Sequence, residues 1–163
     1  MSLGPLLLLA ALAADPPRPP VAGPARIDAE EIRYNWSTRK VKVVGKPYVT
    51  LTRDDLTLTC RRLDGDNDER GQLARAVCEG EVKLVRGTRT ITCERATYDR
   101  DVARVVCEGN PVLRDGGTVA SGQLLTYDLT ADEVRLERSV QATVPAEQLE
   151  LVKKPRPPRE AGR

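Results

Sequence analysis

Residues 91–109, with the sequence ITCERATYDRDVARVVCEG, contain two short apolar patterns that recur along the chain. The first pattern is apolar-x-small-x-x-apolar-x-Tyr/Gly. Its four copies are Ile27–Tyr34, Leu58–Gly65, Ile91–Tyr98 and Ala120–Tyr127. The second pattern is a pair of alternating apolar residues that closes on glycine. Its copies are Val41–Gly45, Ala76–Gly80 and Val105–Gly109, while Val134–Arg138 ends on arginine instead. A repeat of about 30 residues predicts one supersecondary unit stacked on copies of itself.

Within the repeats, apolar residues alternate with polar ones. Leu56–Cys60, Glu81–Leu84 and Val134–Glu137 all show this period of two, which is typical of strands with one apolar face. The 163-residue chain contains no Phe and one Trp, so its core must be built from Val, Leu, Ile and Ala. Turn-forming clusters separate the strands. We therefore expect an all-β fold, a repeat-built antiparallel β-jelly roll in which two sheets face each other across a trough.

Each first pattern also contains a break in its alternation. Small residues at positions 29, 60, 93 and 122 are followed three residues later by apolar residues at 32, 63, 96 and 125. A regular strand would place the next inward residue two positions on, so we expect a one-residue β-bulge at the same place in every repeat. The alternation predicts that the following residues face inward: Ile27, Ala29, Ile32, Val41, Val43, Leu58, Cys60, Ala76, Cys78, Val82, Leu84, Ile91, Cys93, Val105, Cys107, Leu125, Val134 and Leu136.

The two ends of the chain differ from the repeats. The apolar run Leu6–Ala14 is shorter than the roughly 20 residues that span a bilayer. It contains a small-x-small cleavage site, so residues 1–14 are interpreted as a signal peptide for export. An uncleaved anchor is the alternative, since the first five residues carry no Lys or Arg. Residues 15–26 are expected to form a Pro-rich linker, 27–150 the folded domain and 151–163 a basic disordered tail. A short helical turn is expected at residues 146–151.

The four cysteines, at positions 60, 78, 93 and 107, all fall on the predicted inward face. In an oxidising compartment they could pair within hairpins, Cys60 with Cys78 and Cys93 with Cys107. They could also pair between repeats, Cys60 with Cys93 and Cys78 with Cys107, because sequence cannot select the connectivity. Four buried thiols are a further alternative. A Cys₄ zinc site is disfavoured because the chain has no Cys-x-x-Cys knuckle.

Composition excludes several classes of function. The formal net charge is +2 with both signs mixed along the chain, so no basic patch indicates a nucleic-acid partner. The chain has no His, which excludes Ser-His-Asp and Cys-His catalysis. We expect neither enzymatic activity nor a cofactor or metal.

The repeat units resemble those of the OstA/LptA family. The segments AEEIRY at 29–34 and CERATYD at 93–99 resemble the family phrase A-D-x-apolar-x-Tyr. The segments EGEV at 79–82 and EGNPV at 108–112 resemble its G-N-V phrase. The resemblance covers about residues 27–144. The chain departs from the family pattern in its four cysteines, in Arg138 and in its shorter folded region.

This resemblance implies a V-shaped jelly roll that carries lipopolysaccharide between the two membranes of a Gram-negative cell. Acyl chains of lipid A would lie in the apolar trough. The implied partners are LptC-like and LptD-like proteins and further copies of the chain, joined head to tail. The candidate lipid-binding residues are Ile32, Val43, Leu58, Cys60, Cys78, Leu84, Ile91, Cys93, Cys107, Leu125 and Leu136. Candidates to meet lipid phosphates are Arg75, Arg86, Arg89, Arg95 and Arg104, although a solvated strand face also explains them.

Three alternative roles stay open at this point. A membrane-anchored LptC-like component of the same pathway would keep the N-terminal apolar run. A detached N-terminal domain of an LptD-like protein would share the fold. A structural periplasmic β-repeat module would have a dry core in place of a trough.

Overall fold

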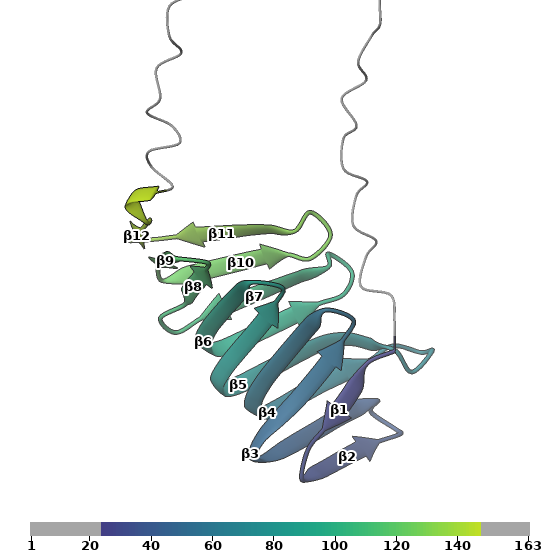
Figure 1. Ribbon diagram of the computed structural model, residues 1–163. Coiled ribbons are helices and arrows are strands. Elements are labelled where there is room, and N and C mark those ends of the chain that lie inside the picture. The colour runs from purple at the N-terminus through teal and green to yellow at the C-terminus, as the bar shows by residue number, and fades with distance from the viewer. Residues whose placement is uncertain (1–23, 148–163) are drawn as a thin grey trace, which may run out of the picture.

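The computed structural model describes residues 24–147, and nearly all of this region is β-structure (Figure 1). Its twelve strands are β1 (Arg26–Asp28), β2 (Glu31–Asn35), β3 (Lys40–Arg53), β4 (Leu56–Asn67), β5 (Leu73–Arg86), β6 (Arg89–Asp99), β7 (Arg104–Glu108), β8 (Val112–Asp115), β9 (Thr118–Ser121), β10 (Leu124–Asp128), β11 (Glu133–Glu137) and β12 (Gln141–Thr143). No helix among residues 24–147 has the length and apolar character needed to cross a membrane. The expected signal peptide and basic tail lie outside the described residues. Of the expected helical turn, residues 146 and 147 are helical and the rest lies outside that range.

The strands form a single antiparallel sheet that folds over on itself to make two facing half-sheets. Half-sheet I consists of β2, residues 40–44, 62–67, 73–79 and 95–99 of the long strands, then β7, β10 and β11. Half-sheet II consists of β1, residues 49–53, 56–60, 82–86 and 89–93, then β8, β9 and β12. The long strands β3 to β6 belong to both half-sheets and bend between them. The predicted all-β jelly roll with a two-sheet trough is confirmed.

The bend between the half-sheets, here called the corner, coincides with the break in alternation. On β4, Cys60 and Leu63 are buried whereas residues 61 and 62 are exposed, which confirms the three-residue step. The expected bulge in every first pattern is wrong, however, because the extra residue between β5 and β6 belongs to β5. Residues 80 and 81 there face residue 94 alone. In the first and fourth repeats, residues 29–30 and 122–123 lie between strands instead. A strand that changes half-sheets must turn, and the turn alters which residues face inward.

The glycines that close the second patterns lie at this corner. Gly80 and Gly109 have φ values of 83° and 78°, a region that residues with a Cβ seldom occupy. An added Cβ at Gly109 would lie 2.5 Å from the Cβ of Glu94. Arg138, which replaces glycine in the fourth repeat, still adopts a φ of 62°. The second, third and fourth repeats therefore share this backbone conformation, whereas Gly45, which closes the pattern of the first repeat, does not have a positive φ.

Two rows of paired residues form the facing surfaces of the half-sheets. In half-sheet I the row contains Ile32, Val43, Leu63, Cys78, Ala96, Cys107, Leu125 and Leu136. In half-sheet II it contains Ile27, Leu51, Leu58, Leu84, Ile91, Leu113, Ala120 and Ala142. The central members of both rows are buried, because strands flank them on both sides.

Two residues that were predicted to face inward are exposed. Ile32 belongs to the half-sheet I row but is 53% exposed, because β2 is an edge strand and has a neighbour on one side alone among the described strands. Ala29 is also exposed, since it lies in the connection between β1 and β2. Alternation predicts the side of a strand that a residue occupies, but burial also requires a neighbour on each flank.

Candidate functional site

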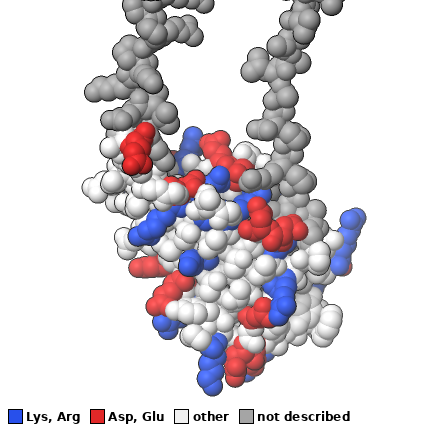
Figure 2. Space-filling model, viewed as in Figure 1, with Lys and Arg blue, Asp and Glu red and all other residues white. Residues whose placement is uncertain are grey.

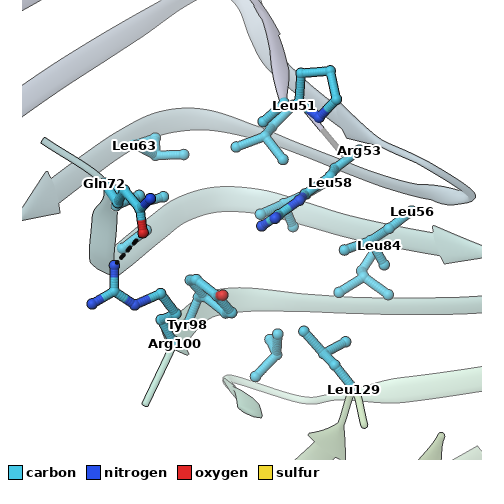
Figure 3. Close-up of a pocket in the computed structure, with 15 residues that line it drawn as sticks. Leu51, Arg53, Leu56, Leu58, Leu63, Gln72, Leu84, Tyr98, Arg100 and Leu129 are labelled. Atoms are coloured by element: carbon cyan, nitrogen blue, oxygen red, sulfur yellow. Dashed lines mark hydrogen bonds between the residues drawn. The ribbon is translucent and has the colours of Figure 1, made fainter. Parts of the chain in front are cut away.

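An apolar cavity of about 430 Å³ lies between the two half-sheets (Figure 3). Leu51, Leu58 and Leu84 line it from half-sheet II, and Leu63 and Tyr98 line it from half-sheet I. The remaining lining residues are Pro24, Ala25, Arg53, Leu56, Gln72, Leu73, Ala76, Arg100, Val105 and Leu129. This volume falls in the roughly 300–1,000 Å³ range of small-molecule sites, and the lining suits a hydrocarbon group.

Two polar side chains, Arg100 and Gln72, lie together on one side of this cavity. Arg100, whose side chain is 33% exposed, makes a 2.8 Å ion pair with Asp68. The same guanidinium lies 3.5 Å from the side-chain oxygen of Gln72 (Figure 3). Backbone hydrogen bonds from Gln72 and Arg70, together with the Arg100 guanidinium, lower the pKa of Asp68. A ligand in the cavity would therefore contact apolar side chains along its length and the partly exposed Arg100 guanidinium on one side.

A buried polar network borders the cavity and joins the half-sheets on the side opposite the corner. Arg86, at the end of β5, is 4% exposed, and its Nη1 donates to the backbone oxygen of the cavity residue Leu129 at 3.2 Å. Arg86 also donates from Nε to Asp55 at 3.2 Å and from Nη1 to the Tyr127 hydroxyl at 3.3 Å. The Tyr127 hydroxyl in turn donates to Asp132 at 2.6 Å. This network, which we call the clasp, ties half-sheet II to the β10–β11 turn.

Charge and burial within the clasp shift its pKa values. Hydrogen bonds from Arg89 and Tyr127 lower the pKa of Asp132 to about 2, against the opposing effect of burial. Burial and the acceptor Asp132 raise the pKa of Tyr127. Burial tends to lower the pKa of Arg86, but its hydrogen bonds to Tyr127 and Asp55 more than offset this and leave the pKa raised. Asp132 is therefore ionised at neutral pH and paired with charged Arg86 and Arg89, while Tyr127 keeps the hydroxyl proton that it donates to Asp132.

The predicted lipid-binding residues divide into three groups. Leu58 and Leu84 line the cavity. Most of the others are buried in the core without lining it: Val43, Cys60, Cys78, Ile91, Cys93, Cys107 and Leu125. Leu136 is partly buried against the core, and Ile32 lies at the exposed edge. The cavity therefore lies toward the N-terminal end of the two inward-facing rows, between β3 and β7.

Several cavity residues were not among the sequence candidates. Leu51 and Leu56 fall outside the repeated patterns, and Leu129 lies in a turn. Leu63 occupied a repeat position but was not selected. The pairing of Leu51 with Leu58 and of Leu58 with Leu84 would have revealed part of this set if the strand register had been known. Turn residues such as Leu129 give no periodic signal.

The arginines considered as phosphate-binding residues occupy different environments. Arg86 is buried in the clasp, so a place at an open rim is excluded for it. Arg89 is three-quarters buried and bound to Asp132 and Asp115. Arg75, Arg95 and Arg104 are exposed on the strands. Figure 2 shows Lys and Arg interspersed with Asp and Glu over the visible face, without a zone of one sign.

The cysteines lie in the corner. Cys60 and Cys78 form a disulfide, with a Cα–Cα distance of 5.8 Å. Cys93 and Cys107 are buried free thiols. The disulfide removes two of the four thiolates that a Cys₄ zinc site would need, and it also excludes the pairing between repeats.

Comparison with known proteins identifies the family. A model of the LptA/(LptD N-terminal domain) LPS transport protein family matches residues 26–133, more than half of the chain. The chain belongs to this family. The LptA-family match covers nearly all strands of both half-sheets, and the resemblance predicted from the repeat phrases is confirmed. No curated protein sequence matches the chain.

A solved structure shares the LptA-family fold. LptH from Pseudomonas aeruginosa, described as the LptA homologous periplasmic component of the lipopolysaccharide transport device, superposes with a TM-score of 0.68. The two sequences are 14% identical, and the match covers 76% of this chain and 96% of that chain. At this identity the likeness establishes the fold alone.

Proposed function

We propose that this protein is a periplasmic carrier of lipopolysaccharide that holds lipid A acyl chains in the cavity between its half-sheets. The observation that carries the proposal is the apolar cavity of about 430 Å³ in a member of a lipopolysaccharide-transport family. Each methylene moved from water into an apolar site gains about 0.8 kcal/mol, so a chain of ten gains about 8 kcal/mol. This gain is large enough to keep a lipid out of water during transfer.

The composition of the cavity lining suits passive transfer of the lipid. Three polar side chains, Arg53, Gln72 and Arg100, are among the cavity lining, and all other lining residues are apolar apart from the Tyr98 hydroxyl. Apolar contacts are non-directional, so a chain can slide along them without breaking a discrete bond at every step. The protein would then need no catalytic group, and the energy for transport would come from another component.

Free sheet edges support assembly into a bridge. Within residues 24–147, β1 and β2 each pair with β3 alone, while β11 pairs with β10 alone and β12 with β9 alone. Both half-sheets therefore present unpaired backbone groups at both ends of the stack, and such edges recruit further strands. Ile32 and the 83% exposed Trp36 lie at the β2 end. We propose that this end joins the β11 and β12 end of another copy or of an LptC-like or LptD-like protein.

The proposal also includes export of the protein, because residues 1–14 are interpreted as a signal peptide. The proposal includes removal of residues 1–14 as a signal peptide, with 15–26 as a linker before β1 and 151–163 as a tail. The mass of the protein isolated from cells distinguishes two roles. A mature chain lacking residues 1–14 supports the periplasmic carrier, whereas an intact N-terminus in the membrane fraction supports the LptC-like alternative.

The decisive experiment is site-specific photocrosslinking in living cells. Leu58 lines the cavity, whereas its neighbour Thr57 lies on the opposite face of β4, so the two sites form a matched pair. Lipopolysaccharide adducts at Leu58 and not at Thr57 are expected. Adducts at neither site, in protein that retains its thermal transition, would leave a structural module with a dry core as the better account. Adducts at both would contradict the assignment of the cavity.

A further inference from the structure

Two successive corners of the fold have the same arrangement of cysteines. In the first, Cys60 lies three residues before Leu63, and Leu63 is the register partner of Cys78. In the second, Cys93 lies three residues before Ala96, and Ala96 is the register partner of Cys107. Cys60 and Cys78 are bonded to each other, whereas Cys93 and Cys107 are free thiols.

The local geometry of the two corners also agrees. Sγ of Cys60 lies 3.1 Å from the backbone oxygen of Arg62, and Sγ of Cys93 lies 3.3 Å from that of Arg95. Two residues after the second cysteine of each corner comes a glycine with positive φ, Gly80 or Gly109. These glycines face the side chains of residues 61 and 94, which directly follow the first cysteine of each corner. The register, the thiol-to-carbonyl contact and the positive-φ glycine that accompany the first disulfide are therefore repeated at the second corner.

We propose that Cys93 and Cys107 form a second corner disulfide, equivalent by the repeat to that of Cys60 and Cys78. The reaction is thiol–disulfide exchange with an oxidant of the disulfide class, either a small-molecule disulfide or a dithiol oxidoreductase. One cysteine thiolate attacks the oxidant disulfide, which gives a mixed disulfide and releases the first oxidant sulfur. The second cysteine thiolate then attacks the protein sulfur of the mixed disulfide and releases the second oxidant sulfur. The two protons of the cysteine thiols end on the two released oxidant sulfurs. One S–S bond forms in the protein and one is consumed in the oxidant.

The burial of the two thiols determines when this bond forms. Cys107 is 0% exposed and Cys93 is 7% exposed. The hydrogen bond with Cys93, together with burial, raises the pKa of Cys107, so almost no thiolate is present in the folded state at neutral pH. Because the thiolate is the reactive species, exchange must take place before the corner closes. The bond therefore forms during folding in an oxidising compartment and resists reduction once the corner is packed.

The bond would reinforce the corner of the trough. Cys93 ends the half-sheet II segment of β6, and Cys107 belongs to β7 in half-sheet I. With the first disulfide, one covalent link would join the half-sheets in each of two adjacent repeats. The corner is thus fixed covalently, while the opposite side is held by the ionic clasp.

The test is the thiol content of full-length protein refolded from the reduced, denatured state with glutathione and glutathione disulfide. Each cysteine falls on a different tryptic peptide, namely residues 54–61, 76–83, 90–95 and 105–114. We expect no alkylation by N-ethylmaleimide in denaturant without reductant, and a linked species of peptides 90–95 and 105–114. A double variant, Cys60→Ser with Cys78→Ser, should still form this species.

Two outcomes would overturn the proposal. One is alkylation of Cys93 and Cys107 in refolded wild type whose Cys60–Cys78 bond has formed. The other is linkage of either residue to Cys60 or Cys78. Cys107→Ser provides a control, in which one alkylated residue, Cys93, is expected per chain. Because the readout is a covalent mass, it does not depend on lipid binding, and a failure here leaves the proposed carrier function untouched.

Discussion

Arg89 and Asp132 form a two-point ion pair on the side of the trough opposite the corner. Nη1 of Arg89 lies 2.7 Å from Oδ1 of Asp132, and Nη2 lies 3.2 Å from Oδ2. The same Oδ1 accepts the Tyr127 hydroxyl and lies 3.5 Å from the buried Arg86. One carboxylate therefore satisfies two arginines and a tyrosine, and it is the centre of the contact between half-sheet II and the β10–β11 turn.

Replacing Asp132 should destabilise the fold. Asp132→Asn removes the charge that compensates Arg86 and Arg89, and we expect the free energy of unfolding to fall by about 2–3 kcal/mol. Glu69→Gln is the matched control, because the Glu69 side chain is 92% exposed and 4.0 Å from Arg39. The control should change stability by less than about 0.5 kcal/mol. Urea unfolding measures both, and equal effects of the two substitutions would show that the clasp contributes no stability.

The same carboxylate predicts a pH dependence. Its folded pKa of about 2 is below the ordinary value of 3.8, so the unfolded state binds more protons between these pH values. The stabilisation is complete above about pH 4 and is lost as the pH falls through about 2. We expect a contribution of about 1–2 kcal/mol after allowance for partial exposure. The stability difference between wild type and Asp132→Asn should shrink from pH 5 to pH 2, and a constant difference would contradict this assignment.

The corner glycines should tolerate a side chain poorly. Gly109 and Gly87 both have positive φ, 78° and 58°, but an added Cβ meets Glu94 at 2.5 Å in Gly109 and nothing within 4 Å in Gly87. Gly87→Ala should cost about 1 kcal/mol for the backbone conformation alone. Gly109→Ala should cost about 1–2 kcal/mol more, since Glu94 must also move. Thermal or urea unfolding of the two variants gives this difference, and similar values would mean that the corner adapts freely.

An edge substitution should separate assembly from folding. Ile32 at the β2 edge and Val102 in the β6–β7 turn are almost equally exposed, at 53% and 52%. If the β2 edge joins another copy, Ile32→Asp should weaken self-association at least tenfold, which corresponds to about 1.4 kcal/mol. Val102→Asp should leave it unchanged, and both variants should unfold within a few degrees of wild type. Sedimentation over a range of concentrations measures the association, and equal effects would argue against a β2 interface.

The sequence predicted the repeat, the all-β class and the family, because these depend on patterns that persist along the chain. The period of two identified the strands around Cys60 and Leu84, and the step from Cys60 to Leu63 marked the place where β4 changes half-sheets. Burial at the ends of the stack was less predictable. Ile32 occupies the same position of the first pattern as the buried Leu63, yet its edge position leaves it exposed.

The chain alone thus determined which residues alternate, where the backbone must turn and which family the repeats belong to. Tertiary structure decided where the space lies and which charges meet. Leu129 lines the cavity and Asp132 binds Arg86 and Arg89 because the β10–β11 turn comes against the β5–β6 hairpin, more than 40 residues earlier in the chain. Local pattern encodes the face of a strand, whereas contacts between distant turns depend on the register and on the fold of the whole sheet.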